Sequence, residues 1–273
     1  MKISKSSLTS FITCPRKYEL AYELEIRPLK HRSELLIGSS THYLISRYLI
    51  RKRAGEPTDL NDILRDFWSP YDLNNTDFGS HEELESAMVR SLDLARVFFR
   101  ETELDPREVE YKFSLPVVNV KTGEVLEDVE LCGIIDMIDQ PNGRSRAIEI
   151  KTRSRKADDF GAQTSVELTC YAYWLRFLDD GDRVLVSYAN IIKNKRPYIQ
   201  WQHQERSTEH FVELFHTIRV VVGNIKERRF YRNPGVHCNW CDYRPICAGD
   251  TEATRELFGE EALELVKDLI GSV

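Results

Sequence analysis

Long apolar runs are missing from this sequence of 273 residues, in which hydrophobic residues make up 41% and charged residues 30%. No stretch approaches the roughly 18 consecutive apolar residues that a membrane span needs. Residues 1–20 also lack the apolar centre and the small-residue cleavage site of a secretory signal. We therefore expect a protein without a membrane segment that stays in the cytoplasm, where its thiols are kept reduced.

A basic excess is missing as well, since 38 lysines and arginines face 44 aspartates and glutamates, giving a net charge of -6. This balance argues against a protein that coats nucleic acid, although it leaves room for a local basic groove. Positive side chains do gather in the second half of the chain, at Arg144, Arg146, Arg153, Arg155, Lys156, Lys193, Lys195 and Arg196. Charge alone neither indicates nor excludes a nucleic-acid partner.

Hydrophobic spacing predicts helices in the first part of the chain and strands after it. Helical spacing covers most of residues 5–56, with a break at Pro28, and continues in residues 57–104 with a helix over 81–103. The expected strands cover residues 109–115, 125–138, 147–151, 183–192 and 198–202, with helices over 165–177 and 209–228. This order predicts an α/β fold with a mixed sheet flanked by helices, in which residues 1–105 are mostly helical and 106–230 form the sheet core.

A pattern of charged side chains occurs on two of the expected strands. Glu149 and Lys151 are two positions apart, so both project from one face while Ile150 points into the core. Asp136 ends the preceding apolar strand and could lie beside Glu149. Two carboxylates so placed bind a hard cation such as Mg²⁺ or Mn²⁺, and Lys151 could orient an attacking water. The alternative is a surface strand of alternating charge, which explains most E-x-K triplets.

Six cysteines are present, and three of them crowd near the C-terminus as Cys238-x2-Cys241-x5-Cys247. In a reducing compartment such a cluster favours metal ligation over disulfides. The spacing suits either zinc or an iron–sulfur centre and requires a fourth ligand. Cys132 and Cys170 stand in apolar segments, so we expect them to be buried thiols.

Together these motifs resemble the PD-(D/E)XK nucleases and, among them, the RecB-like exonucleases. The motifs that carry the resemblance are the opening segment from Ser6 to Tyr18, Gly38-Ser39-Ser40-Thr41-His42, Glu110, and the set of Asp136, Glu149 and Lys151. With the cysteines they cover nearly the whole of residues 5–247. The resemblance implies a restriction-endonuclease-like fold with a helical N-terminal segment.

The resemblance also implies a metal site for Mg²⁺ or Mn²⁺. It assigns as ligands His42, Asp136, Glu149 and the carbonyl of Ile150, with Glu110 assisting. Lys151 would then position the water for in-line attack. Outside this context, a histidine such as His42 on a helix is usually a core or surface residue.

One helix departs from the family pattern. The family carries Q-x-x-x-Y on the helix expected over residues 165–177, and Tyr171 fits its tyrosine. Glu167 stands where the glutamine is expected, and a carboxylate there would add charge near the metal or face DNA phosphates badly. Gln163, one turn earlier, could replace the missing amide.

A subset of these nucleases, including AddB-type helicase-nucleases and CRISPR-adaptation exonucleases, binds a [4Fe-4S] cluster through one N-terminal and three C-terminal cysteines. The resemblance assigns the cluster to Cys14, Cys238, Cys241 and Cys247 and makes zinc the less favoured metal. Such a cluster would act as a staple between the ends of the chain.

The resemblance implies a metal-dependent DNA exonuclease acting on single-stranded ends, in DNA recombination, repair, or CRISPR or phage DNA processing. Two alternatives are a non-catalytic iron–sulfur subunit that binds DNA or helps assembly, and a redox protein. No phosphate-binding loop G-x-x-x-x-G-K-[ST] occurs, so unwinding would need a helicase or another DNA-processing partner. We expect residues 1–250 to form the nuclease domain. Residues 251–273 would be an acidic amphipathic helix, either a partner or self-association surface or simply packed on the domain.

Overall fold

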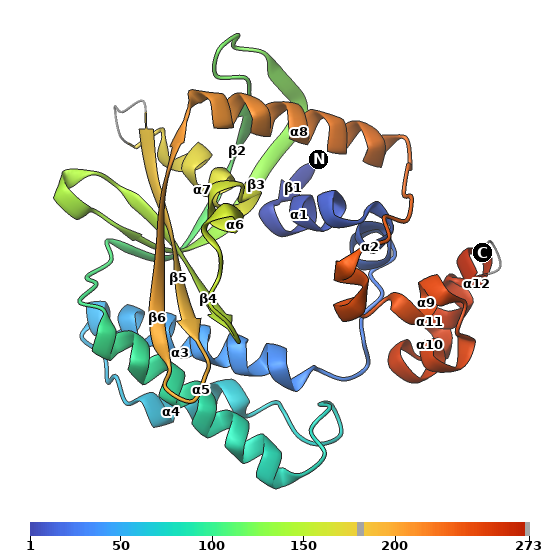
Figure 1. Cartoon of the computed structure of the whole chain (residues 1–273), viewed down its shortest axis with the longest axis horizontal. Helices are drawn as coiled ribbons and strands as arrows, with labels where there is room; N and C mark the ends of the chain where they lie inside the picture. The colour runs from blue at the N-terminus through green and yellow to red at the C-terminus, as the bar shows by residue number, and fades with distance from the viewer. Residues whose placement is uncertain (179–182, 271–273) are drawn as a thin grey trace. The chain divides into compact units, whose positions relative to one another are not determined.

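The computed structural model describes residues 1–178 and 183–270 (Figure 1). The chain divides into two compact units, each assembled from separate segments. The first unit comprises Met1–Lys5 and Arg32–Phe215, and the second comprises Ser6–His31 and His216–Val273. Among the described residues, no helix is both long and apolar enough to cross a membrane.

The first unit is built on a mixed 6-stranded sheet. Its strands are β1 (Lys2–Ser4), β2 (Glu108–Val118), β3 (Val125–Asp139), β4 (Arg146–Arg153), β5 (Arg183–Ile192) and β6 (Tyr198–Ser207). They follow the order β1-β3-β4-β5-β6, and β2 also pairs with β3. β2, β3 and β4 are antiparallel neighbours, whereas β4 and β5 run parallel. The predicted mixed sheet with its initial meander is therefore confirmed.

Some strand boundaries differ from those predicted. β1, which has three residues, is too short for a periodic signal and forms only by pairing in parallel with Glu130 to Cys132 of β3. β6 extends to Ser207 because it pairs with β5 along its full length, although its second half is polar. β3 continues beyond Asp136 to Asp139, so the expectation that Asp136 ends a strand was wrong.

Two long helices and a shorter one cover one side of this sheet, and the shorter helix packs on the two long ones (Figure 1). They are α3 (Ser33–Ala54), α4 (Leu60–Trp68) and α5 (His81–Glu101). Their apolar side chains share one core with Met137, Ile148 and Ile150 of the sheet. The helical character predicted for this part of the chain is confirmed.

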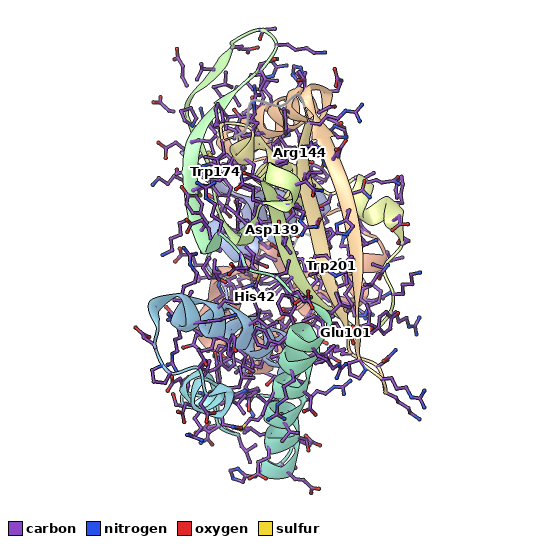
Figure 2. The ribbon with its side chains drawn as sticks, turned by 90° about the vertical axis from the view of Figure 1, so that its left-hand side faces the viewer. His42, Glu101, Asp139, Arg144, Trp174 and Trp201 are labelled. Atoms are coloured by element: carbon purple, nitrogen blue, oxygen red, sulfur yellow. The ribbon has the colours of Figure 1, made fainter. Side chains whose placement is uncertain are left out.

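Local sequence fixes the ends of these helices. The side chains of Asp59 and Ser80 accept backbone hydrogen bonds at the N-termini of α4 and α5. Gly55 ends α3 in the left-handed conformation, with φ of 71°. At the other end of α5, Glu101 accepts a hydrogen bond from the Ile199 amide at 2.9 Å and so joins the helix to β6 (Figure 2).

The connection between the parallel strands β4 and β5 contains α6 (Asp159–Gln163), which the sequence did not indicate, and α7 (Val166–Leu175). Side chains alternate along β4, so Ile148 and Ile150 face the long helices. Glu149 and Lys151 point to the other side, where they contact Tyr171 and Glu167 of α7. The fold therefore places the E-x-K pair between β4 and the crossover helix.

The second unit is made of helices. It contains most of α1 (Lys5–Thr13), α2 (Pro15–Tyr18), the π-helical turn η1 (Glu19–Glu23), the later part of α8 (Thr208–Lys226), the 3-10 turn η3 (Val236–Trp240), α9 (Arg244–Ala248), α10 (Thr251–Phe258), α11 (Glu260–Leu265) and α12 (Lys267–Ile270). A small core joins its segments and includes Leu20, Ile26, Tyr243, Ile246 and Phe258. Hydrogen bonds also tie the two sequence segments together, among them that from the Tyr243 hydroxyl to the Ile26 carbonyl at 2.8 Å.

The end of the chain does not form the single amphipathic helix that was expected over residues 251–273. α10 ends at Phe258, and Gly259 follows with φ of 87°, a conformation that interrupts the helix. α11 and α12 are short helices after this break. Residues 271–273 lie outside the described part of the chain.

Candidate active site

The site begins where β3 and β4 separate. Their ladder pairs Met137 with Ile148, and no pair is formed beyond it, although β4 continues to Arg153. The Ile150 amide donates instead to Oδ2 of Asp136 at 2.8 Å. Asp136 is 6% exposed, and its carboxylate takes the place of a strand partner at this opening.

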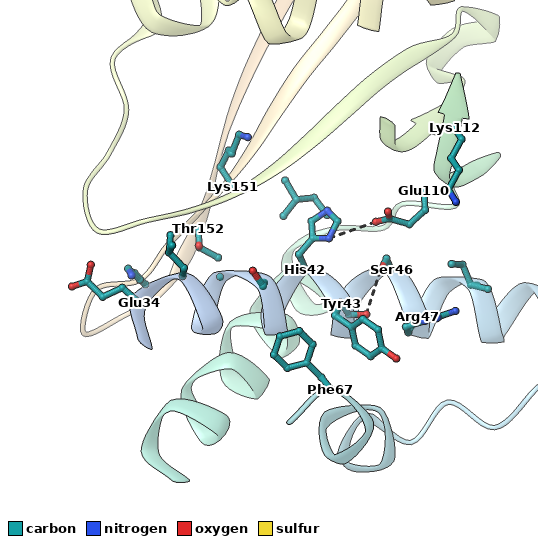
Figure 3. A pocket seen from close by; sticks show the side chains of 16 residues that line it. Glu34, His42, Tyr43, Ser46, Arg47, Phe67, Glu110, Lys112, Lys151 and Thr152 are labelled. Carbon is teal, nitrogen blue, oxygen red and sulfur yellow. Dashed lines mark hydrogen bonds and ion pairs between the residues drawn. The ribbon is translucent and has the colours of Figure 1, made fainter. Parts of the chain in front are cut away.

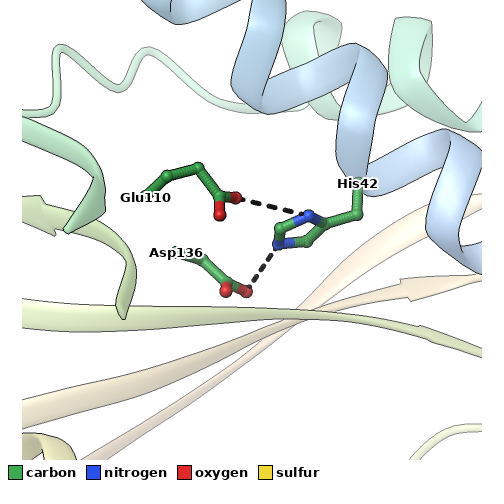
Figure 4. Close-up of side chains that lie close together, drawn as sticks. All are labelled: His42, Glu110 and Asp136. Atoms are coloured by element: carbon green, nitrogen blue, oxygen red, sulfur yellow. Dashed lines mark ion pairs between the residues drawn. The ribbon is translucent and has the colours of Figure 1, made fainter. Parts of the chain in front are cut away.

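His42 of α3 reaches the same opening, as Figure 4 shows. Its Nε2 lies 3.0 Å from Oδ2 of Asp136, and its Nδ1 lies 3.5 Å from Oε1 of Glu110 on β2. One ligand atom from each of the three residues lies within 4.8 Å of the others. Among the described residues this is the only such group of histidine, cysteine and carboxylate ligands. We call it the acid triad.

Gly38 explains how α3 comes so close to the sheet. A Cβ atom at this position would lie 2.8 Å from Oγ1 of Thr152 on β4, too close for any other residue without movement. Gly38 stands one turn before His42 on the same helix. The glycine of the G-x-x-x-H segment therefore permits the approach that brings His42 to Asp136.

Glu110 is held in an unusual conformation. Its φ of 54° is left-handed, although it lies within β2. The conformation is strained for a non-glycine residue by about 1–2 kcal/mol. Its Oε1 atom is buried and has no hydrogen-bond partner among the described atoms. A buried carboxylate oxygen without a donor is a ready ligand for a cation.

The acid triad carries an excess of negative charge that His42 partly balances. Burial opposes a charge on His42, but the hydrogen bond and charge of Asp136, with Glu110 and Glu149, raise its pKa from 6.5 to about 9. Burial also raises the pKa of Glu110, although the neighbouring His42 opposes this shift. At neutral pH an imidazolium therefore links two carboxylates.

Four charged side chains form a second group next to the acid triad, which we call the lysine ring: Lys5, Glu149, Lys151 and Glu167. Lys5 Nζ lies 2.9 Å from Glu149 and 3.0 Å from Glu167. Lys151 Nζ lies 2.5 Å from Glu149 and 3.0 Å from Glu167. Each lysine thus contacts both glutamates. Burial opposes the lysine charges, but the two carboxylates outweigh it and raise the pKa of both lysines.

Tyrosine hydroxyls complete the hydrogen bonding of the two glutamates. Tyr171 is fully buried and donates to Oε2 of Glu149, and Tyr188 donates to Oε2 of Glu167 at 3.1 Å. Burial and then the charge of Glu149 raise the pKa of Tyr171, so its phenol stays protonated. Glu149 was expected among the metal ligands, but its oxygens contact Lys5, Lys151 and Tyr171 and are not part of the acid triad.

A cavity of about 880 Å³ opens over this region (Figure 3). His42, Glu110 and Lys151 line it, together with Ile150 and Lys112. Of the lysine ring only Lys151 belongs to this lining. The cavity therefore brings two members of the acid triad, His42 and Glu110, and one lysine of the ring to a common space.

The family model for the PD-(D/E)XK nuclease superfamily matches residues 2–248. The chain belongs to this superfamily. Membership of this superfamily, together with the acid triad, supports nuclease activity. Nucleases of this superfamily use divalent metal ions.

Solved structures resemble this nuclease as well. A protein from Eubacterium rectale, named as a candidate exonuclease, is 14% identical with a TM-score of 0.50, over 83% of this chain and 79% of its own. At that identity the likeness concerns the fold alone. The protein SSO0001 is 17% identical over 91% of this chain and 86% of its own, with a TM-score of 0.39, which is too distant to carry an argument. No curated protein matches the chain.

A second cavity of about 630 Å³ shares Glu34, Thr152 and Lys193 with the first. Its lining includes four cations, Arg153, Arg155, Lys156 and Lys193. The first three of these lie at the end of β4 and in the loop after it, and this loop is tied to β6. The side-chain amide of Gln200 both accepts from the Ala157 amide at 2.9 Å and donates to its carbonyl at 2.8 Å. The basic loop is thus held in place beside the acid triad and the lysine ring.

The four cysteines of the expected cluster site belong to the second unit. Cys14 precedes α2, Cys238 lies in η3, Cys241 follows it, and Cys247 lies in α9. All four line one cavity of about 290 Å³, along with the cations Lys17, Arg232 and Arg244. All six cysteines of the chain are free. The structure thus brings the distant Cys14 to the C-terminal cysteines.

The remaining predicted positions divide between confirmation and correction. Cys170 is fully buried, as expected, whereas Cys132 is only half-buried, with its thiol 3.7 Å from the Ile3 carbonyl. Gln163 is exposed at the end of α6. Glu167, considered unfavourable from the sequence, contacts both lysines of the ring. Lys5 was missed altogether, because a single lysine before the opening motif carries no spacing signal.

Proposed function

We propose that this nuclease is a metal-dependent deoxyribonuclease that hydrolyses phosphodiester bonds at single-stranded DNA ends. The observation that carries the proposal is the acid triad, whose His42 and Glu110 line the same cavity as Lys151 where β3 and β4 separate. A hard cation prefers such nitrogen and oxygen ligands, and a lysine beside it can act on a phosphate. The roles below are those that this arrangement supports.

His42, Glu110 and Asp136 would hold Mg²⁺ or Mn²⁺, with Glu149 and the carbonyl of Ile150 as further ligands. Oε1 of Glu110 supports this fit, because it is buried without a hydrogen bond and has His42 Nδ1, 3.5 Å away, as its ion-pair partner. When bound, the metal lowers the pKa of a water molecule and offsets the charge that develops on the phosphate. On cation binding His42 loses its proton, since a metal ligand must be a neutral imidazole.

Lys151 would orient the attacking water and stabilise the negative charge of the phosphate. Its place in the cavity lining gives it access to substrate. Tyr171 positions Glu149, because its phenol stays protonated and donates a hydrogen bond to that carboxylate. The orientation of Glu149 in turn fixes one side of the Lys151 ammonium.

The second cavity would guide the DNA strand toward the acid triad. Its four cations would pair with phosphates of the backbone, and its fixed loop reduces the entropy lost on binding. Phe160 follows this loop on α6 and is 70% exposed, as a base-stacking residue must be. A single strand suits these features, and a helicase or another DNA-processing protein would supply it.

Cys14, Cys238, Cys241 and Cys247 would bind a [4Fe-4S] cluster rather than zinc. The four cysteines line one cavity of about 290 Å³, which supports a single centre held by four thiolates. Lys17, Arg232 and Arg244 would balance the negative charge of the thiolate-bound cluster. Its role would be a staple within the second unit, in a cytoplasmic protein whose residues 1–250 act as the nuclease and whose later residues form a tail.

Cutting assays on end-labelled single-stranded DNA test the proposal directly. The parent protein is expected to release nucleotides with Mg²⁺ or Mn²⁺ and not in EDTA, whereas Asp136→Ala and Lys151→Ala lose this activity. Equal cutting by all three proteins would overturn the assignment. A parent without activity that still binds DNA would favour the alternative of a non-catalytic subunit. Visible absorption of an anaerobic preparation, with iron and zinc analysis, tests the cluster.

A further inference from the structure

The lysine ring is a closed arrangement of alternating charge. Two ammonium groups and two carboxylates contact one another in all four possible combinations of opposite sign, at distances from 2.5 to 3.0 Å. The positive and negative charges are therefore balanced. Such balance matters here, because an unpaired charge in a buried position is costly by several kcal/mol.

The two lysines differ in their surroundings. The Lys5 side chain is 14% exposed, and its ammonium also contacts the Tyr171 hydroxyl and lies 4.5 Å from the centre of the Tyr171 ring. The Lys151 side chain is 31% exposed and lines the large cavity, which Lys5 does not. Lys5 is thus enclosed behind the cavity, and Lys151 stands at its wall.

The difference decides which lysine can leave the ring. If Lys151 turns toward a phosphate in the cavity, Lys5 still contacts both Glu149 and Glu167. Without Lys5, Lys151 would be the only cation of the ring beside one buried carboxylate, Glu149, and one half-buried carboxylate, Glu167. Its movement would then leave both of them unpaired, so the ammonium would stay between them.

We infer that Lys5 and Glu167 form a matched charge pair, in which Lys5 is a positioning residue that leaves Lys151 available to the substrate. Glu167 adds a carboxylate to this side of the site, and Lys5 adds the cation that compensates it. The inference rests on the proposed function in one respect only, namely that Lys151 contacts the substrate once it turns away from the ring.

A double-mutant cycle of Lys5→Met, Glu167→Gln and both changes tests the pair. One readout needs no activity, namely the rate at which Lys151 is reductively methylated, followed by mass spectrometry. We expect Lys5→Met to slow this labelling about tenfold and the double variant to return it to within about threefold of the parent. Lys2→Met is the matched control, because Lys2 lies on β1, three residues before Lys5, and its side chain is 72% exposed.

The second readout is the kinetics of DNA cutting. Lys5→Met should lower kcat about 30-fold with KM changed less than about threefold, and the double variant should recover most of kcat. If Lys5 only stabilised the fold, the additional change Glu167→Gln would not restore kcat. Unchanged labelling of Lys151 in Lys5→Met, or a double variant no better than Lys5→Met, would overturn the inference.

The two readouts separate this inference from the proposed function. A parent protein that cuts no DNA with either metal refutes the proposed function, while the labelling still decides whether Lys5 frees Lys151. If Lys5→Met fails to fold but the double variant folds, the matched pair is supported by folding itself. If neither folds, Lys5→Arg, which keeps the charge, must retain labelling and kcat within about threefold of the parent; a larger loss counts against the pair.

Discussion

The acid triad and the lysine ring lie side by side, yet they solve the problem of buried charge in different ways. In the ring, every carboxylate has a lysine and a tyrosine hydroxyl as partners. In the acid triad, two carboxylates share one histidine, and Oε1 of Glu110 has no hydrogen-bond donor. One group is complete as it stands, and the other lacks positive charge.

This difference indicates where a cation belongs. A divalent ion in the acid triad would add the missing charge and satisfy Glu110, whereas in the ring it would have to displace an ammonium. The strained backbone of Glu110 also indicates that the cation binds in the acid triad, because strain of this kind persists where function requires it. The balanced ring instead holds Lys151 close to the acid triad.

The largest effect should follow from Asp136→Asn, which neutralises the carboxylate shared by His42 and the Ile150 amide. The asparagine oxygen can still accept from Ile150, so the fold should persist. We expect cutting with Mn²⁺ to fall at least about 1000-fold, because a ligand charge is lost from the acid triad. Mn²⁺ titration and cutting assays check this. Asp93→Asn on α5 is the control, because Asp93 is exposed and its change should alter neither Mn²⁺ binding nor cutting.

Gly38→Ala should lower the rate of DNA cutting about tenfold, because it displaces the acid triad and not the ring. The new Cβ would meet Thr152 Oγ1 at 2.8 Å, displacing α3 and with it His42. The added clash should cost about 1–2 kcal/mol, although alanine gains about 1 kcal/mol of helix propensity. Cutting rates and urea unfolding measure the two effects.

Gly223→Ala on α8 is the matched control, because its new Cβ meets no atom within 4 Å. This variant should gain up to about 1 kcal/mol of stability without loss of cutting. The double change Gly38→Ala with Thr152→Ala removes the obstructing hydroxyl and should recover part of the activity. Wild-type cutting by Gly38→Ala alone would show that α3 can move without consequence.

The contribution of the acid triad to stability should also depend on pH. The contribution of the ring should not, because the pKa values of its lysines are raised. The pKa of His42 is raised to about 9, so its contribution to metal-free stability is complete below pH 6.5 and is lost as pH rises through 9. The shift corresponds at most to about 3 kcal/mol, and solvent screening at a side chain 30% exposed leaves about 1–2 kcal/mol. Urea unfolding in EDTA at pH 6 and pH 9.5 should show this loss, and His42→Asn should remove it.

Metal binding should show the opposite trend. A cation must displace the His42 proton, so Mn²⁺ affinity should rise about tenfold per pH unit between 6.5 and 9. Affinity that is independent of pH over this range would mean that His42 does not bind the metal.

The sequence predicted those features of the acid triad and of the ring that depend on local spacing. Alternation on β4 correctly placed Glu149 and Lys151 on one side of the strand and Ile150 in the core. The G-x-x-x-H spacing pointed to His42, and the structure adds the reason for its glycine. These features are local, since one helix turn or two strand positions are enough to define them.

Other features depend on contacts between distant segments and could not be predicted. Lys5 joins the ring because the three-residue strand β1 pairs with β3, a contact with no periodic signal. The left-handed backbone of Glu110 is set by its surroundings and not by its residue type. The break in the C-terminal tail did have a local signal, Gly259, which the expectation of one helix overlooked.

The smallest effect is expected outside both groups, at the basic loop of the second cavity. Arg155 is exposed and, in the proposed function, contacts only phosphate, so Arg155→Ala should raise KM for single-stranded DNA about threefold to tenfold and leave kcat unchanged. The slope of log KM against log salt should fall by about 1, because one fewer counterion is released. Arg65→Ala on α4, which removes an equally exposed charge, is the control. A change in kcat with constant KM would instead place Arg155 with Lys151 in the chemistry and erase the distinction between binding loop and reacting groups.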